Sequence, residues 1–324
     1  MRWAWRAVAV LALGIAACAV PRAEKLFFSS RALTDPVAAD CERCHQDVYR
    51  EWRESGHARA WTSEAFRTAS SDARAEACTG CHAPAPVDAE AEVALRAAHL
   101  DEGVTCLSCH LSTRPGAAPL TMRGPASRTS PIEIHPVVEE DPFYRSSELC
   151  GRCHELELRQ WKAAAEPADG KAKATCQECH MPGVHRKVES VHDEHGYSAL
   201  FVALGREQDL RRHDFAVPAE TEEWISLRTD VSRGVLRVRV LNDVPHALPT
   251  GAFGRRKVRV VTHWPGGSDE RDLAGTMESS IAAGGEREVR IPLPAHVHVE
   301  DVEVRLERWD RTIHDWTGLS RALR

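Results

Sequence analysis

The residues with the clearest chemistry in this chain are ten cysteines arranged as five Cys-x-x-Cys pairs, each followed at once by a histidine. The motifs read CERCH at 41–45, CTGCH at 78–82, CLSCH at 106–110, CGRCH at 150–154 and CQECH at 176–180. On a helical turn, residues i, i+3 and i+4 lie on one face, so two thiols and an imidazole can reach one ligand together. This spacing is typical of covalent haem attachment, in which both thiols bond to the porphyrin and the histidine binds its iron.

The same roles can be assigned in every motif. The cysteines expected to form thioether bonds are Cys41, Cys44, Cys78, Cys81, Cys106, Cys109, Cys150, Cys153, Cys176 and Cys179. The histidines expected to bind iron on the proximal side are His45, His82, His110, His154 and His180. The chain should therefore carry five covalently bound haem c groups.

Two other uses of paired cysteines compete with haem attachment. Zinc ribbons take two pairs for each metal ion, so five pairs would leave one pair without a metal. A disulfide scaffold suits an exported protein, but it gives no reason for five histidines in register. The repeated histidine therefore favours haem over both alternatives.

All five motifs lie between Cys41 and His180, which leaves little polypeptide around each cofactor. So short a segment is poorly suited to a conventional hydrophobic core, and aromatic residues make up only 6% of the chain. We expect stacked porphyrins to supply much of this core. Neighbouring haems would then lie close together, as a chain for electron transfer requires.

The N-terminus has the pattern of an export signal. It carries two arginines, followed by an apolar run at residues 7–17 that is too short to span a bilayer. The run ends in Ile-Ala-Ala-Cys at 15–18, which resembles a bacterial lipobox. The resemblance implies a signal peptide at 1–17, acylation of Cys18, a tether at 18–37 and an outer-membrane lipoprotein on the periplasmic side. The alternative is an ordinary signal peptide cut beside Ala17 or Ala19.

The net charge and the expected location limit the classes of partner. The formal net charge is -6, from 42 basic and 48 acidic residues without a long run of one sign, so nucleic-acid binding gains no support. The expected partners are redox proteins of the cell envelope and the membrane, reached through the lipid anchor. A larger cytochrome complex or an oligomer is also compatible with the sequence.

A six-coordinate haem needs a second, distal ligand, and a family resemblance indicates where to look. The segment Tyr49-x-x-Trp52-x-x-Ser55-x-His57-Ala58 is similar to the region after the first motif in the cytochrome c-554 family. The resemblance continues through 103–110, 148–154, 175–182 and RRHDF at 211–215, covering about residues 38–217. It implies that His57, His135 and His213 are distal ligands. Family members commonly have four haems in this block, so one of the five motifs departs from the pattern.

Further histidines are open candidates. At least one of His185, His192 and His195 is expected to bind iron, and the sequence does not choose among them. His246 lies in HALPTG, which resembles a His-x-x-Pro-Thr-Gly segment of many multihaem cytochromes. It either reaches a haem as a distal ligand or belongs to a loop or plain turn. His99 ends an expected helix at 91–100 and is either a ligand or a surface residue of that helix.

The hydrophobic pattern changes after Pro218. Before it, segments rich in alanine, glutamate and arginine favour short helices, and residues 114–131 form a Pro/Gly/Ser loop. After it, about seven segments alternate apolar and polar residues at period two, as antiparallel strands do. We expect a mainly helical and irregular cytochrome c domain at 38–217, followed by an all-β sandwich resembling an immunoglobulin-like module at 218–324.

Three functions fit these residues. An electron-transfer relay needs mostly bis-histidine haems and no substrate site. An enzyme of nitrogen-oxide or hydroxylamine chemistry needs one open haem, but no Cys-x-x-Cys-Lys motif is present and there are only three tyrosines. An anchored subunit would dock into a larger complex through its β module. We favour the relay and assign no catalytic residues.

Overall fold

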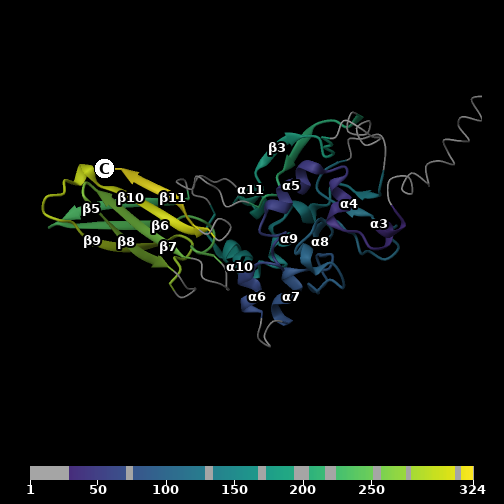
Figure 1. Ribbon diagram of the computed structural model, residues 1–324, viewed down its shortest axis with the longest axis horizontal. Coiled ribbons are helices and arrows are strands. Elements are labelled where there is room, and N and C mark those ends of the chain that lie inside the picture. The colour runs from purple at the N-terminus through teal and green to yellow at the C-terminus, as the bar shows by residue number, and fades with distance from the viewer. Residues whose placement is uncertain are drawn as a thin grey trace, which may run out of the picture. The chain divides into compact units, whose positions relative to one another are not determined.

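The computed structural model describes nine segments of the chain (Figure 1). They are residues 29–70, 76–127, 134–166, 173–192, 204–215, 224–250, 257–274, 279–310 and 315–323. The predicted signal peptide, the lipidation site Cys18 and the candidate ligand His195 lie outside them. In the segments that are described, no helix is both long enough and apolar enough to cross a membrane.

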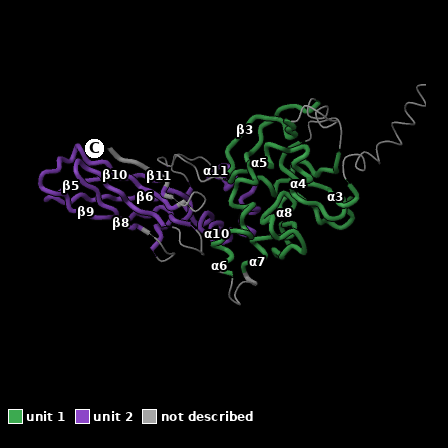
Figure 2. The backbone as a smooth tube through the Cα atoms, viewed as in Figure 1, with its two compact units in different colours: residues 1–145, 181–215 green, residues 146–180, 216–324 purple. Residues whose placement is uncertain are grey.

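The chain forms two compact units that interleave in sequence (Figure 2). The first contains residues 1–145 and 181–215, and the second contains 146–180 and 216–324. The expected cytochrome domain at 38–217 is therefore divided, because the two motifs within 146–180 group with the strands that follow residue 216. The expected domain boundary at 217/218 lies close to residues 215 and 216, where the chain passes from the first unit to the second for the last time.

The helical segments are short and many contain or flank a motif (Figure 1). They are α3 (Ser30–Thr34), α4 (Ala38–Glu42), α5 (Gln46–Glu54), α6 (Glu64–Ala69), α7 (Glu76–His82), α8 (Cys106–His110), α9 (Ser147–Gly151), α10 (Glu155–Ala163) and α11 (Cys176–His180), with 3-10 turns at Leu100–Glu102 and Pro142–Arg145. Helices of this length are marginal in isolation, so they depend on what they pack against. Buried apolar side chains of the first unit include Trp52, Phe66 and Leu107.

Two short strand pairs organise the first unit. The parallel pair β1 (Met122–Arg123) and β2 (Val137–Val138) joins the segment after the third motif to the segment after His135. The antiparallel pair β3 (Gly183–Arg186) and β4 (Gln208–Arg211) carries the returning part of the chain. Each pair adjoins a histidine predicted as a distal ligand, because His135 precedes β2 and His213 follows β4.

One expectation about the N-terminal half needs correction. The helix expected at 91–100 does not form: the segment makes a β-bridge between Pro84 and Leu95. It packs so closely on α7 that a Cβ added to Gly80 would lie 2.9 Å from the Val93 carbonyl oxygen, so backbone pairing overrides the helix propensity of alanine. Within the expected tether, residues 30–34 form α3.

Seven antiparallel strands follow in the second unit (Figure 1). They are β5 (Ile225–Ser232), β6 (Val235–Asn242), β7 (Val258–Trp264), β8 (Gly267–Ala274), β9 (Gly285–Pro292), β10 (Glu303–Asp310) and β11 (Asp315–Leu323). They form a three-stranded sheet in the order β5-β6-β9 and a four-stranded sheet in the order β11-β10-β7-β8. A β-rich region after the cytochrome segment is thus confirmed.

The two sheets share one apolar core. Along β6 every second residue is buried, with Leu236, Val238 and Val240 fully inaccessible to solvent. They belong to one cluster with Val260 of β7 and Leu306 of β10. The period-two pattern read from the sequence therefore marks the face on which the sheets meet.

Leu236→Ala should lower the free energy of unfolding of the β-rich region by about 3 kcal/mol, because it leaves a cavity in this core. The same change at Leu241, on the other face of β6 and only partly buried, should cost about 1 kcal/mol or less. Denaturant unfolding of both holoprotein variants, followed by circular dichroism, measures the difference. Equal losses would contradict the assignment of the two faces.

Candidate functional site

Each Cys-x-x-Cys-His motif forms the tight turn that its spacing predicts. The His45 amide donates to the Cys41 carbonyl at 2.9 Å, and the His154 amide donates to the Cys150 carbonyl at 2.9 Å. In the other three motifs the histidine is the last residue of α7, α8 or α11. Both cysteines and the histidine of a motif therefore share one turn.

The donor set of these turns fits haem attachment. None of the ten motif cysteines is held in a disulfide. In the described part of the chain, no three or more His, Cys, Asp or Glu side chains are grouped to hold a metal ion by themselves. Two thiols and one imidazole on each turn are what a c-type haem requires.

Backbone carbonyls orient three of the proximal imidazoles. The ring Nδ1 atoms of His45, His82 and His110 lie 3.1, 2.7 and 2.7 Å from the carbonyl oxygens of Val188, Ala60 and Arg123. A carbonyl can only accept, so Nδ1 carries the proton and Nε2 keeps its lone pair. This tautomer leaves Nε2 free to bind iron, as is usual for histidine ligands of metals.

Three proximal histidines each have a second histidine ring at nearly the same distance. The ring centres are 6.5 Å apart for His45 and His135, 6.1 Å for His110 and His213, and 6.2 Å for His180 and His246. Metal–imidazole bonds are about 2 Å long, so two imidazoles on opposite sides of one metal ion have ring centres about 6 Å apart. The three pairs match the spacing of bis-histidine coordination.

The second histidine of each pair is also held through Nδ1. The Nδ1 atoms of His135, His213 and His246 lie 3.4, 3.0 and 3.1 Å from the carbonyl oxygens of Pro136, Arg211 and Ala247. Their Nε2 atoms are again the nitrogens with a lone pair. In the pairs His45–His135 and His110–His213, both members are therefore in the tautomer that can bind iron.

The remaining candidate ligands have different surroundings. The His57 ring lies edge-on to Phe215, with ring centres 4.2 Å apart. His185 and His192 are exposed and contact carboxylates: His185 Nδ1 lies 2.8 Å from Asp209, and His192 Nε2 lies 2.8 Å from Asp47. The bond to Asp209 raises the pKa of His185. These contacts favour surface ion pairs for the last two residues.

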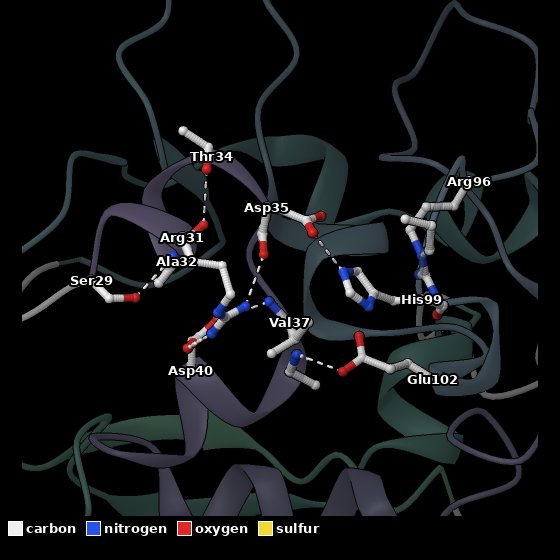
Figure 3. Close-up of polar contacts among 12 residues, drawn as sticks. Ser29, Arg31, Ala32, Thr34, Asp35, Val37, Asp40, Arg96, His99 and Glu102 are labelled. Carbon is white, nitrogen blue, oxygen red and sulfur yellow. Dashed lines mark hydrogen bonds and ion pairs between the residues drawn. The ribbon is translucent and has the colours of Figure 1, made fainter.

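The His99 ring also contacts a carboxylate. Figure 3 shows its ring facing Asp35, with 2.9 Å between Nε2 and the carboxylate oxygen. His99 has a positive φ of 53° and precedes the 3-10 turn Leu100–Glu102. Its side chain thus ties the loop to the end of α3 at the protein surface.

The third motif is the most deeply buried of those in the first unit. Burial lowers the pKa of His110, and burial together with the neighbouring His110 lowers the pKa of His213 to about 4. Burial also raises the pKa of Cys109 to about 11. A neutral imidazole is the form that binds a metal ion, so both rings are in the binding form at neutral pH.

Two residues that the sequence did not single out surround this motif. The buried Arg123 forms ion pairs with Asp141 and Asp88, while its carbonyl accepts the bond from His110. The Tyr144 ring stacks on His110 with centres 5.3 Å apart, and its hydroxyl donates to the Cys109 carbonyl. Arg123 lies in the two-residue strand β1 and Tyr144 in a 3-10 turn, and neither carries a periodic pattern, so only the fold brings them to the motif.

Cysteines of different motifs touch. Cys41 hydrogen-bonds Cys106, and this bond together with burial raises the pKa of Cys106. Cys150 hydrogen-bonds Cys176, and this bond lowers the pKa of Cys176 to about 6. The attachment turns of motifs one and three are thus adjacent in the first unit, and those of motifs four and five are adjacent in the second.

Glu51 joins the first motif to the histidine paired with the third. Its carboxylate accepts two bonds from Arg186, at 2.7 and 2.8 Å, and one from the His213 amide at 2.9 Å. Arg212 lies 3.3 Å away. Burial favours the neutral acid, but these donors outweigh it and lower the pKa of Glu51. The buried carboxylate therefore fixes α5 to the strand that ends beside His213.

Five Cys-x-x-Cys-His turns, three of them with an orienting carbonyl and three with a nearby second histidine, define a multihaem c-type cytochrome. Residues 40–111 match the family model described as cytochrome c554 and c-prime, and residues 93–181 match that of cytochrome c7 and related cytochrome c. The two matches together span all five motifs. No curated protein matches the chain.

A solved structure has a similar fold. It is a penta-heme cytochrome c552 from Thermochromatium tepidum, with a TM-score of 0.54 and 17% sequence identity. The similarity covers 88% of this chain and 97% of the other. It therefore includes both units, and it supports the architecture rather than any residue's role.

Glu51→Ala should lower the free energy of unfolding by about 3 kcal/mol, because it leaves Arg186 without its carboxylate in a partly buried site. Glu54→Ala on the exposed side of the same helix should change it by about 0.5 kcal/mol or less. Denaturant titration of the two holoproteins gives both values. A loss at Glu51 no larger than at Glu54 would show that the buried carboxylate does not hold these segments together.

Proposed function

We propose that the protein is an electron-transfer relay of the cell envelope, carrying five haem c groups with mostly bis-histidine ligation. The spacing of about 6 Å within three histidine pairs is the observation that carries this proposal. A haem with imidazole on both sides of the iron has no free position for a substrate. Such a site transfers electrons without binding the molecules that supply or receive them.

Different residues have different roles in such a relay. The ten motif cysteines attach the cofactors, and the bound haem supplies one-electron redox chemistry. His45 with His135, His110 with His213, and His180 with His246 hold the axial positions of three sites. In the first two of these sites, carbonyls bonded to Nδ1 fix both rings, so little rearrangement accompanies a change of charge at the site. The adjacent turns of motifs one and three, and of four and five, favour transfer within each unit.

The location and the form of the β module belong to the same proposal. The lipobox-like segment supports acylation at Cys18 and an outer-membrane lipoprotein on the periplasmic side, with redox proteins of the envelope as partners. The first, second and fifth strands of the module share one sheet, and the third, sixth and seventh share the other. This distribution supports an immunoglobulin-like sandwich whose fourth strand has joined the second sheet.

A second function is favoured by the surroundings of His82. Its ring stacks on the aromatic ring of Phe66, with centres 4.0 Å apart and planes 14° apart, whereas the three paired proximal histidines each have a histidine ring as neighbour. An open axial position on this haem would allow a small ligand to bind, as an enzyme of nitrogen-oxide chemistry requires. Carbon monoxide added to the reduced wild type tests this: binding by about one haem in five supports the enzyme, and no binding supports the relay.

The purified protein should contain five haems per chain. The pyridine haemochrome spectrum, compared with the protein concentration from amino-acid analysis, gives this ratio. The five motifs are equivalent in their free thiols and histidines, so each should be occupied. A ratio of four or fewer in fully matured protein would contradict the proposal that every motif carries haem.

His213→Ala should convert one low-spin haem into a high-spin haem that binds carbon monoxide, because it removes the ring opposite His110. Electron paramagnetic resonance of the oxidised protein and optical titration of the reduced protein measure the two changes. His185→Ala is the matched control, since that ring contacts Asp209 at the surface. Unchanged spectra for the His213 variant, or equal changes for both, would overturn the assignment of His213 as a ligand.

A further inference from the structure

His246 lies on a loop that continues from the last residue of β6. The loop returns beside the segment before β9, where Leu248 and Ile281 exchange backbone bonds at 2.9 and 2.7 Å. It places the His246 ring 6.2 Å from the ring of His180, with the planes 21° apart. Both rings belong to the second unit, so one compact body contains the whole arrangement.

Asn242 secures the start of this loop. Its side chain is completely buried, and Nδ2 donates to the carbonyl oxygens of His246, Ile281 and Ala282 at 3.0, 2.9 and 3.1 Å. Its Oδ1 accepts from the Val244 amide at 3.2 Å. A polar side chain in an apolar core is costly unless it is bonded, so this network strongly restrains the loop.

Gln160 secures the loop from the other side. Its Oε1 accepts from the Ala247 amide at 3.0 Å. Gln160 lies on α10, the helix that begins directly after His154 of the fourth motif. The backbone on both sides of the His246 side chain is therefore fixed, by Asn242 through the His246 carbonyl and by Gln160 through the next amide.

We infer that Asn242 and Gln160 are positioning residues that hold His246 as the distal ligand of the haem attached at Cys176 and Cys179. The inference rests on the proposed function, because it requires bis-histidine ligation at this site. It gives the β module a direct part in the haem chain: the module supplies an axial ligand and the hydrogen bonds that keep it in place.

The expected effect follows from the loss of one hydrogen bond. A neutral hydrogen bond contributes about 1 kcal/mol, which corresponds to roughly a fivefold change in an equilibrium. Without the Gln160 bond, His246 should leave the iron more often. Carbon monoxide binding to the reduced haem is limited by that departure, so its rate reports how firmly the loop is held.

The test uses three variants of the full-length holoprotein. His246→Ala removes the ligand and should create one high-spin haem that binds carbon monoxide rapidly. Gln160→Ala should keep the low-spin spectrum but accelerate carbon monoxide binding at one haem about fivefold. Gln160→Glu retains an acceptor oxygen for the Ala247 amide and should restore the wild-type rate.

Arg159→Ala is the matched control on α10. Its side chain is exposed and pairs with Glu155 on the same helix, so its removal should leave the rate unchanged. Asn242→Asp replaces the donor nitrogen with an acceptor at equal size and should accelerate binding further. Circular dichroism verifies that each variant retains its strands before rates are compared.

The outcomes distinguish ligation by His246 from the positioning role of Asn242 and Gln160. If His246→Ala opens a haem while the Gln160 and folded Asn242 variants bind carbon monoxide at the wild-type rate, the positioning role is overturned and the ligation stands. If His246→Ala leaves the spectra unchanged, the pairing of His246 with His180 is itself overturned. An equal acceleration in Gln160→Ala and Arg159→Ala would show a general effect on α10 and would also overturn the positioning role.

Discussion

Each motif turn presents two thiols and an imidazole on one face, and the rest of the structure supplies what that turn lacks. A turn of five residues can attach a cofactor and offer one axial ligand, but it cannot reach the opposite side of the iron. In the bis-histidine sites proposed above, the second histidine comes from elsewhere in the chain. His135, His213 and His246 lie beside proximal histidines in this way, from the segment before β2, the segment after β4 and the loop after β6.

The local sequence pattern is sufficient to predict the attachment turns and the strands. Cys-x-x-Cys-His works within a single helical turn, so its geometry is set by neighbours in sequence. The strands after residue 224 could be predicted for a similar reason, since period-two alternation reports directly which face is buried. Distal partners are a different kind of property, because they depend on contacts between residues far apart in the chain.

The distal candidates show where sequence reasoning stopped. His213 and His135 were named through family resemblance, but the motif that each one faces could not be read from the sequence. The sequence leaves His246 open between a ligand and a turn, and the buried Asn242 beside it gives no periodic signal. The helix expected at 91–100 does not form, because backbone pairing with Ala83 and Ala85 outweighs the helix preference of alanine. In each case the deciding contact is non-local.

The interleaving of the two units has a consequence for biogenesis. The chain leaves the first unit at residue 145, returns to it at 181 and leaves again at 215. Because a chain is synthesised from its N-terminus, Cys106 and Cys109 are made about a hundred residues before His213. The first unit therefore stays incomplete until the segment 181–215 has been made. Until then the thiols of its motifs belong to an open polypeptide rather than to a closed unit.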